Sequence, residues 1–267
     1  TDTGILARQY SDRQDYARGI THDVNLGFGF ATGAATHDVV IGYDYQNTTY
    51  SSDNFRAAAP SIDLNAPNYG IEIPVNRDPA RNRGGTTKTE QHGLYLQDQI
   101  QFDTNWNLLL GLRHDWADQT ISYKAIDLKQ DRTSERTTWR AGLVYEAENG
   151  LAPYVSYSQS FFPISVAQYT DDISFDPMLG EQIELGLRYQ PVGSNMMFSA
   201  SVYELTQENV VSRTPSGDLT QIGQQRARGF ELEAKGDLTD SVSIAAAYAY
   251  TDARITRSEV VSEIGQR

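Results

Sequence analysis

The stretch Gln182-Ile183-Glu184-Leu185-Gly186-Leu187-Arg188-Tyr189 alternates polar and apolar side chains, and Gly186, which has no side chain, occupies one of the polar positions. Successive side chains of a β-strand point to opposite faces, so this period of two predicts a strand with one apolar and one polar face. The same period recurs at 23–30, 38–45, 107–116, 229–235 and 242–250. The recurrence predicts an all-β chain of antiparallel strands.

The connections between these stretches alternate in length. Short ones lie near 31–35, 103–106, 148–151, 191–195 and 237–240, and long or polar ones near 51–88, 124–137, 164–180 and 212–221. Tight turns at one end of a sheet and long loops at the other are typical of an outer-membrane β-barrel. We expect about eleven strands of roughly 9–16 residues, although ~9–11 tilted residues already cross the hydrocarbon core. The extra length would project above the membrane.

Composition narrows the function classes. The 267 residues carry a net charge of -13, which argues against nucleic acid as a partner because such proteins need a basic face. The chain has no Cys and only four scattered His, so we expect no metal site. Phosphate loops, zinc-protease helices and nucleophile elbows are also missing from the sequence, so we expect no enzyme and no cofactor.

Five ordered motifs carry a family resemblance. They are 93–100 (GLYLQDQI) followed by 105–106 (NW) and 110–115 (LGLRHD); 153–161 (PYVSYSQSF); 175–177 (FDP) with 180–186 (GEQIELG); 225–233 (QRARGFELE); and 247–253 (AYAYTDA). In this order and spacing they resemble the barrel of TonB-dependent siderophore receptors of the ferrichrome and ferripyoverdine type. The resemblance covers nearly the whole chain and is weakest in the long loops.

The resemblance implies an architecture and a function. Such receptors are 22-stranded barrels in the outer membrane of Gram-negative bacteria, and an N-terminal plug domain fills the lumen. They import a ferric siderophore, energised through TonB, which acts on a segment near the plug. Residues 1–267 would then be a partial barrel domain without the plug or the TonB-contacting segment. Outer-membrane lipid and lipopolysaccharide would surround a full-length monomer.

Candidate ligand contacts lie at strand tops and in the expected long loops. The aromatic candidates are Tyr50, Phe55, Tyr69, Phe161, Phe162, Tyr169 and Phe175, and the basic candidates are Arg77, Arg81 and Arg83, near Lys88. Aromatic and cationic side chains would suit an anionic or amphipathic iron chelate. The aromatics equally fit a membrane-interface girdle, and the basic cluster equally fits a solvated loop or a lipopolysaccharide phosphate contact.

Two further expectations concern the faces of the sheet. Gly229, Glu231 and Glu233 share the polar phase and should face the barrel lumen. Asp98 breaks the pattern, because it shares the phase of Leu94 and its apolar neighbours. Either Asp98 lies near the membrane interface or a bulge re-aims its side chain.

Two other functions remain open at this point. A passive pore or a receptor for another nutrient would share the barrel. A soluble β-rich binding module would share the alternation, although the strand lengths and the loop asymmetry favour the barrel.

Overall fold

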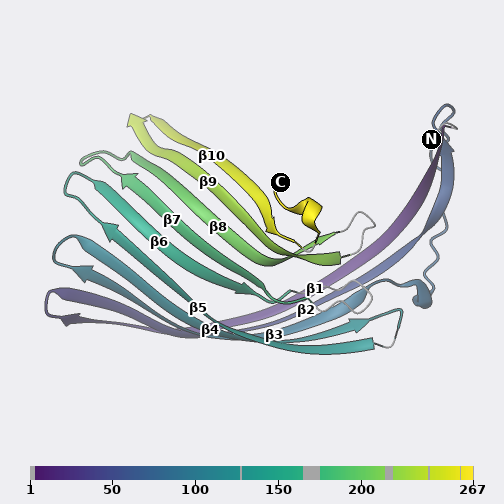
Figure 1. Ribbon diagram of the computed structural model, residues 1–267, viewed down its shortest axis with the longest axis horizontal. Helices are drawn as coiled ribbons and strands as arrows, with labels where there is room; N and C mark the ends of the chain where they lie inside the picture. The colour runs from purple at the N-terminus through teal and green to yellow at the C-terminus, as the bar shows by residue number, and fades with distance from the viewer. Residues whose placement is uncertain are drawn as a thin grey trace.

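The computed structural model describes residues 4–126, 128–164, 175–213, 219–239, 241–258 and 260–266. These residues form one ten-stranded antiparallel sheet in which each strand pairs with its neighbour in the sequence. The strands are β1 (Ile5–Thr32), β2 (Ala35–Asp63), β3 (Gly85–Phe102), β4 (Trp106–Tyr123), β5 (Leu128–Tyr145), β6 (Leu151–Phe162), β7 (Met178–Tyr189), β8 (Met197–Arg213), β9 (Leu219–Thr239) and β10 (Val242–Arg257). The sheet is curved like an open trough, with the tight turns along one end (Figure 1). No helix in this part of the chain has the length and apolarity needed to cross a membrane.

The strands are longer and fewer than the sequence predicts. Within the described residues there are ten, one fewer than expected, and the longest, β2, has 29 residues. The expected loop at 124–137 is mostly strand, because β5 begins at Leu128. Polar side chains tie β4 to β5 there: Thr120 donates to Asp131 and Thr133 donates to Asp118, both at 2.6 Å. Cross-strand hydrogen bonds of this kind extend a ladder beyond its apolar part.

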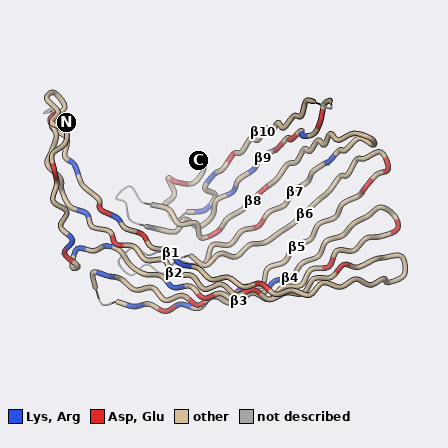
Figure 2. Tube along the Cα trace, turned by 180° about the vertical axis from the view of Figure 1, so that it is seen from behind, with Lys and Arg blue, Asp and Glu red and all other residues tan. Residues whose placement is uncertain are grey.

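The expected irregular segment 51–88 is also partly strand. β2 continues to Asp63 because it pairs with β1 as far as Ile5. The resulting hairpin rises well beyond the other strands, and it carries charged residues along its length (Figures 1 and 2). The following loop folds back onto it through the short helix η1 (Pro79–Arg81) and Asn82, whose side-chain oxygen accepts from the backbone N–H of Asn54 at 3.0 Å. Similarly, the expected loop at 212–221 is shortened, since β8 runs to Arg213 and β9 starts at Leu219.

The two faces of the sheet differ as the alternation predicts. Apolar side chains stand on one face with large exposed fractions, for example 70% for Val24 and 60% for Leu185. On the other face, polar side chains reach across intervening strands: Tyr95 on β3 donates to Asp23 on β1 at 3.0 Å. In a membrane barrel the apolar face meets lipid and the polar face meets the lumen, so the polar face is assigned to the inside of the curved sheet. We call it the inner face and the apolar side the outer face.

Aromatic rows mark both limits of the outer apolar band. Near the turns, the rings of Trp106 and Tyr145 lie 4.9 Å apart. Toward the loops, His22, Tyr45, His92 and Trp116 stand in one row across β1 to β4. Paired aromatic rows of this kind are typical of the two interfaces of a membrane.

Asp98 keeps the outward orientation that its phase predicts. The pairing of β2 with β3 runs unbroken from Ala35 to Ser51, so the bulge alternative is wrong. Its carboxyl instead contacts His37, whose Nδ1 lies 2.8 Å from Asp98 Oδ2. A charged residue in the outward phase is therefore paired rather than re-aimed.

Candidate functional site: the inner wall of the sheet

The most tightly bonded charges of the inner wall centre on Arg113 of β4. Its guanidinium donates to Asp44 of β2 at 2.5 and 3.0 Å and to Asp115 at 2.6 Å. Gln91 of β3 also donates to Asp115, at 3.0 Å. The side chain of Asp115 is only 4% exposed. Two carboxylates thus share one cation, and the cluster links three strands while keeping a net negative charge.

Glycines make this reach possible. At five places on the inner face a long side chain lies flat over a glycine of the next strand. The pairs are Tyr95 over Gly42, Arg113 over Gly93, Arg140 over Gly111, Tyr154 over Gly186 and Tyr203 over Gly229. At Gly93, for example, an added Cβ would lie 2.6 Å from the Arg113 guanidinium carbon, far inside van der Waals contact. Close approach, rather than turn geometry, therefore requires glycine here.

The crossing side chains end on polar partners. Tyr203 crosses β9 and its hydroxyl lies 2.7 Å from Thr251 Oγ1 on β10. Tyr154 donates to Glu184 at 2.5 Å, and Arg140 donates to Gln97 on β3. The polar side chains of the wall are thus laid along it and held, instead of projecting freely into the lumen.

Recesses open on this wall, and two of them are lined by charged residues of both signs toward the middle and the loop end of the strands. One, of about 370 Å³, is lined by residues that include Asp23, Asp44, Arg113 and Arg140. The other, of about 100 Å³, is lined by residues that include Arg136, Gln159, Glu181 and Glu208. Each recess is lined by both basic and acidic side chains, so each could bind a polar group through hydrogen bonds or ion pairs. Within the described residues, no group of three His, Cys, Asp or Glu could hold a metal ion.

The candidate contacts near β1 to β3 are partly engaged by the protein itself. Tyr50 lies on the inner face and accepts from Arg13 Nη2 at 2.7 Å. Phe55 is buried, with 9% exposure, and Arg77 donates to Asp12 at 2.8 Å. The three remaining candidates in this region are exposed: Tyr69, Arg81 and Arg83.

The other candidates flank the connection between β6 and β7. Phe162 at the end of β6 is exposed, Phe161 is half-buried and Phe175 is buried. Tyr169 lies outside the described residues. The structure therefore separates the described candidates into one group on β2 and in the segment between β2 and β3, and another at the end of β6 and before β7. Ligand contact by any of them stays a prediction.

A clamp that the sequence does not reveal fixes the start of β7. Gln221 of β9 donates to the carbonyl oxygens of Asp176 and Asn209 at 2.8 and 2.9 Å, and it accepts from the Asp176 N–H at 2.9 Å. Asn209 has a φ of 59° and donates to the Pro177 carbonyl at 2.9 Å. The Asn209 conformation is one that Asn tolerates better than most residues. No local pattern marks Gln221, because its partners lie on other strands.

The loop end of the sheet contains a titratable contact with a testable pH dependence. The Lys124 ammonium and the Asn82 amide lower the pKa of Asp53, and Lys124 Nζ lies 2.8 Å from Asp53 Oδ1. A lowered folded-state pKa means that the contact stabilises the protein above the unfolded pKa of ~3.9 and loses this effect as the pH falls through the folded value.

We therefore expect Lys124→Met to lower the free energy of unfolding by less than about 1 kcal/mol at pH 7, since both groups are partly exposed. The difference from wild type should vanish at acid pH. Denaturant unfolding at both pH values checks this, with Lys88→Met as the control, because Lys88 on β3 is exposed and its removal should leave the Asp53 contact intact. A deficit that persists in acid would contradict the assignment.

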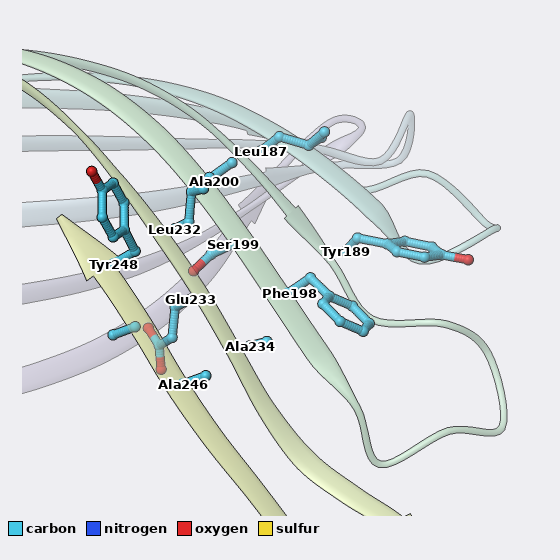
Figure 3. Close-up of a pocket in the computed structure, with 11 residues that line it drawn as sticks. Leu187, Tyr189, Phe198, Ser199, Ala200, Leu232, Glu233, Ala234, Ala246 and Tyr248 are labelled. Carbon is cyan, nitrogen blue, oxygen red and sulfur yellow. The ribbon is translucent and has the colours of Figure 1, made fainter. Parts of the chain in front are cut away.

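A mainly apolar hollow lies on the other side of the wall. It has a volume of about 450 Å³ and opens on the outer face of β7 to β10. Ala200, Ala234 and Ala246 provide small side chains between the rings of Phe198 and Tyr248 (Figure 3). Its position on the apolar face sets it apart from the polar recesses of the inner wall.

Ten long antiparallel strands, an apolar outer band between aromatic rows and a bonded polar inner wall define a segment of a membrane β-barrel wall. The family model described as TonB dependent receptor-like, beta-barrel matches residues 1–266. The chain therefore belongs to the TonB-dependent receptor β-barrel family.

Individual relatives agree with this membership. The chain is 37% identical to the ferrioxamine B receptor of Salmonella typhimurium over 95% of its own length and 36% of that protein. It is 34% identical to the ferrichrome outer membrane transporter/phage receptor of Escherichia coli over 94% of its length and 34% of that protein. The chain thus spans about a third of the curated relatives it matches.

Solved structures share the fold. The siderophore receptor PiuA from Acinetobacter baumannii superposes with a TM-score of 0.77 at 20% identity, covering 96% of this chain and 41% of that one. BauA, the ferric preacinetobactin receptor from the same organism, superposes with a TM-score of 0.76 at 21% identity, covering 99% and 40%. The names of these relatives are those of receptors and transporters rather than enzymes.

Proposed function

We propose that this chain is part of an outer-membrane receptor that imports a ferric siderophore, energised through TonB. The observation that carries the proposal is the 37% identity with the ferrioxamine B receptor over almost the whole chain. The ferrichrome transporter, at 34%, supports the same substrate class. The chain itself would supply barrel wall, loop-end residues and the polar inner face.

The proposal includes the surroundings of the barrel. The receptor would lie in the outer membrane of a Gram-negative bacterium as a monomer, with lipid around the outer apolar band. Lipopolysaccharide would meet the outer face at its loop end, where Lys88 and Arg18 stand on either side of Thr49 in one row. TonB would act through the plug of the full-length receptor.

The inner wall fits a plugged lumen better than an open channel. Its long polar side chains are bonded along the wall, as with Arg113 to Asp44 and Tyr95 to Asp23. A wall of fixed polar side chains suits a folded polar domain seated against it, because little ordering entropy is lost when the contacting side chains are already held.

The test is iron uptake by the full-length receptor that contains this chain. Expressed in a host without other siderophore receptors, it should import radiolabelled iron as ferrioxamine B or ferrichrome. Import should stop in a host without TonB and after collapse of the proton-motive force. Diffusion through a passive pore would survive both treatments, and transport of another metal chelate alone would support a receptor for a different nutrient.

The loop-end aromatics give a separate prediction. We expect Phe162→Ala to weaken siderophore binding by roughly three- to thirtyfold, because an exposed ring offers apolar contact area to an amphipathic chelate. Equilibrium binding to the purified full-length receptor measures this. Tyr16→Ala, which removes an exposed ring from β1 on the outer face, is the control and should leave binding unchanged. Unchanged binding in Phe162→Ala would remove this residue from the ligand site.

A further inference from the structure

A polar cluster stands on the outer face, where the surroundings are apolar. It consists of Thr32 at the end of β1, His37 on β2 and Asp98 on β3. His37 Nδ1 lies 2.8 Å from Asp98 Oδ2, and His37 Nε2 lies 2.7 Å from Thr32 Oγ1. The imidazole therefore links the other two side chains, and both of its nitrogens are engaged.

The cluster is packed against apolar and aromatic neighbours. The ring of Phe30 stacks on the His37 ring with centroids 4.7 Å apart and planes 5° from parallel. Val39 pairs with Asp98 from β2 and is 7% exposed, and Leu110 pairs with it from β4. Asp98 therefore lies between two apolar neighbours on the outer face.

One carboxyl oxygen remains without a partner. Asp98 Oδ1 is buried, and no donor among the described residues lies within hydrogen-bonding distance of it. The side chain as a whole is 25% exposed and that of His37 is 14% exposed. A buried acceptor in an apolar setting is satisfied in almost all native structures, so a donor from outside this chain segment is expected.

The depth of the site indicates where the donor comes from. Asp98 lies four residues before the end of β3 at Phe102, roughly 13 Å along a strand, or about 9 Å of depth for a strand tilted by ~45°. The headgroup layer on each side of a bilayer is about 5–7 Å thick. The carboxyl is therefore near the boundary between headgroups and hydrocarbon at the turn end of the sheet, opposite the long loops.

We propose that Thr32, His37 and Asp98 form a headgroup site for a phospholipid with a primary ammonium, such as phosphatidylethanolamine, in the leaflet at the turn end. The ammonium would approach the Asp98 carboxylate, whose side chain is 25% exposed, and would donate to Oδ1 once a rotation of the carboxyl brings that oxygen to the lipid-facing surface. Its acyl chains would lie against the apolar residues beside the site, Leu110 and Phe102 among them. A choline headgroup cannot replace it, because a quaternary ammonium has no N–H to donate.

Lipid selectivity of the full-length receptor tests the site. Purified receptor is placed in vesicles that contain equal amounts of spin-labelled phosphatidylethanolamine or phosphatidylcholine, and the fraction of each lipid held at the protein surface is measured. Wild type should prefer the ethanolamine lipid roughly three- to tenfold at this site. Asp98→Leu should reduce the ratio to about one.

Two further variants separate the site from general effects. Asp98→Asn keeps the shape of the side chain, so it should fold even if Asp98→Leu does not. Because it removes the negative charge, it should lose most of the preference for the ethanolamine lipid. Asp38→Asn is the matched control, since Asp38 lies on the inner face of the adjoining strand and should keep the wild-type ratio. Equal retention of both lipids by wild type, or a preference that survives in both Asp98 variants, would overturn the proposal. Because the readout is lipid retention, failure here leaves the siderophore proposal unaffected.

Discussion

Replacing Arg113 by Met should lower the free energy of unfolding of the full-length receptor by about 3–5 kcal/mol. The variant leaves Asp44 and Asp115 without their shared cation, and the side chain of Asp115 is only 4% exposed. Removing one partner of a buried charged group is costly because the remaining charge has lost its compensation. Guanidinium unfolding in lipid vesicles, followed by fluorescence, measures the loss.

A compensating variant makes this prediction specific to the charge. Adding Asp44→Asn and Asp115→Asn to Arg113→Met should recover most of the stability, since no unpaired charge then remains. Arg81→Met serves as the control because Arg81 is exposed in the loop before β3, so its effect should stay within about 0.5 kcal/mol. If Arg113→Met behaved like this control, the cluster would contribute nothing measurable.

Replacing Gly42 by Ala should destabilise the receptor by about 1–3 kcal/mol. The new Cβ would lie 2.6 Å from a ring carbon of Tyr95, so the ring would have to lift off β2 and release its hydrogen bond to Asp23. The usual effect of Gly→Ala in a strand is the reverse, a gain of roughly 0.5–1 kcal/mol from the restricted unfolded chain. The Tyr95 side chain that crosses Gly42 therefore decides that the change lowers stability instead of raising it.

Gly142 provides the matched control on β5. A Cβ built there meets its nearest atom at 3.8 Å, an ordinary contact, so Gly142→Ala should be neutral or slightly stabilising. Combining Gly42→Ala with Tyr95→Ala should cost less than the sum of the two single changes, because the clash is then absent. Equal effects of the two glycine variants would show that crossing side chains do not explain the glycines of the inner wall.

The sequence by itself determined that the chain is all-β, which face each side chain takes, and that the strands follow one another as antiparallel hairpins. The alternation from Gln182 to Tyr189 is a local property, and an antiparallel sheet of sequential hairpins needs only local turns. The resemblance carried by the ordered motifs also agreed with the family match over residues 1–266. These features can be predicted from the sequence because a one-residue slip in register would turn every apolar side chain to the wrong face, so the alternation fixes the register.

The tertiary structure alone decided how far the strands extend and which charges meet. Arg113 and Asp44 are 69 residues apart, and His37 and Asp98 are 61 apart, so only the register of the sheet brings them within bonding distance. The role of Gly42 is equally hidden, because a glycine in a strand looks the same with or without a ring above it. Side-chain alternation reports which face a residue takes, whereas its partners depend on strands that are distant in the sequence.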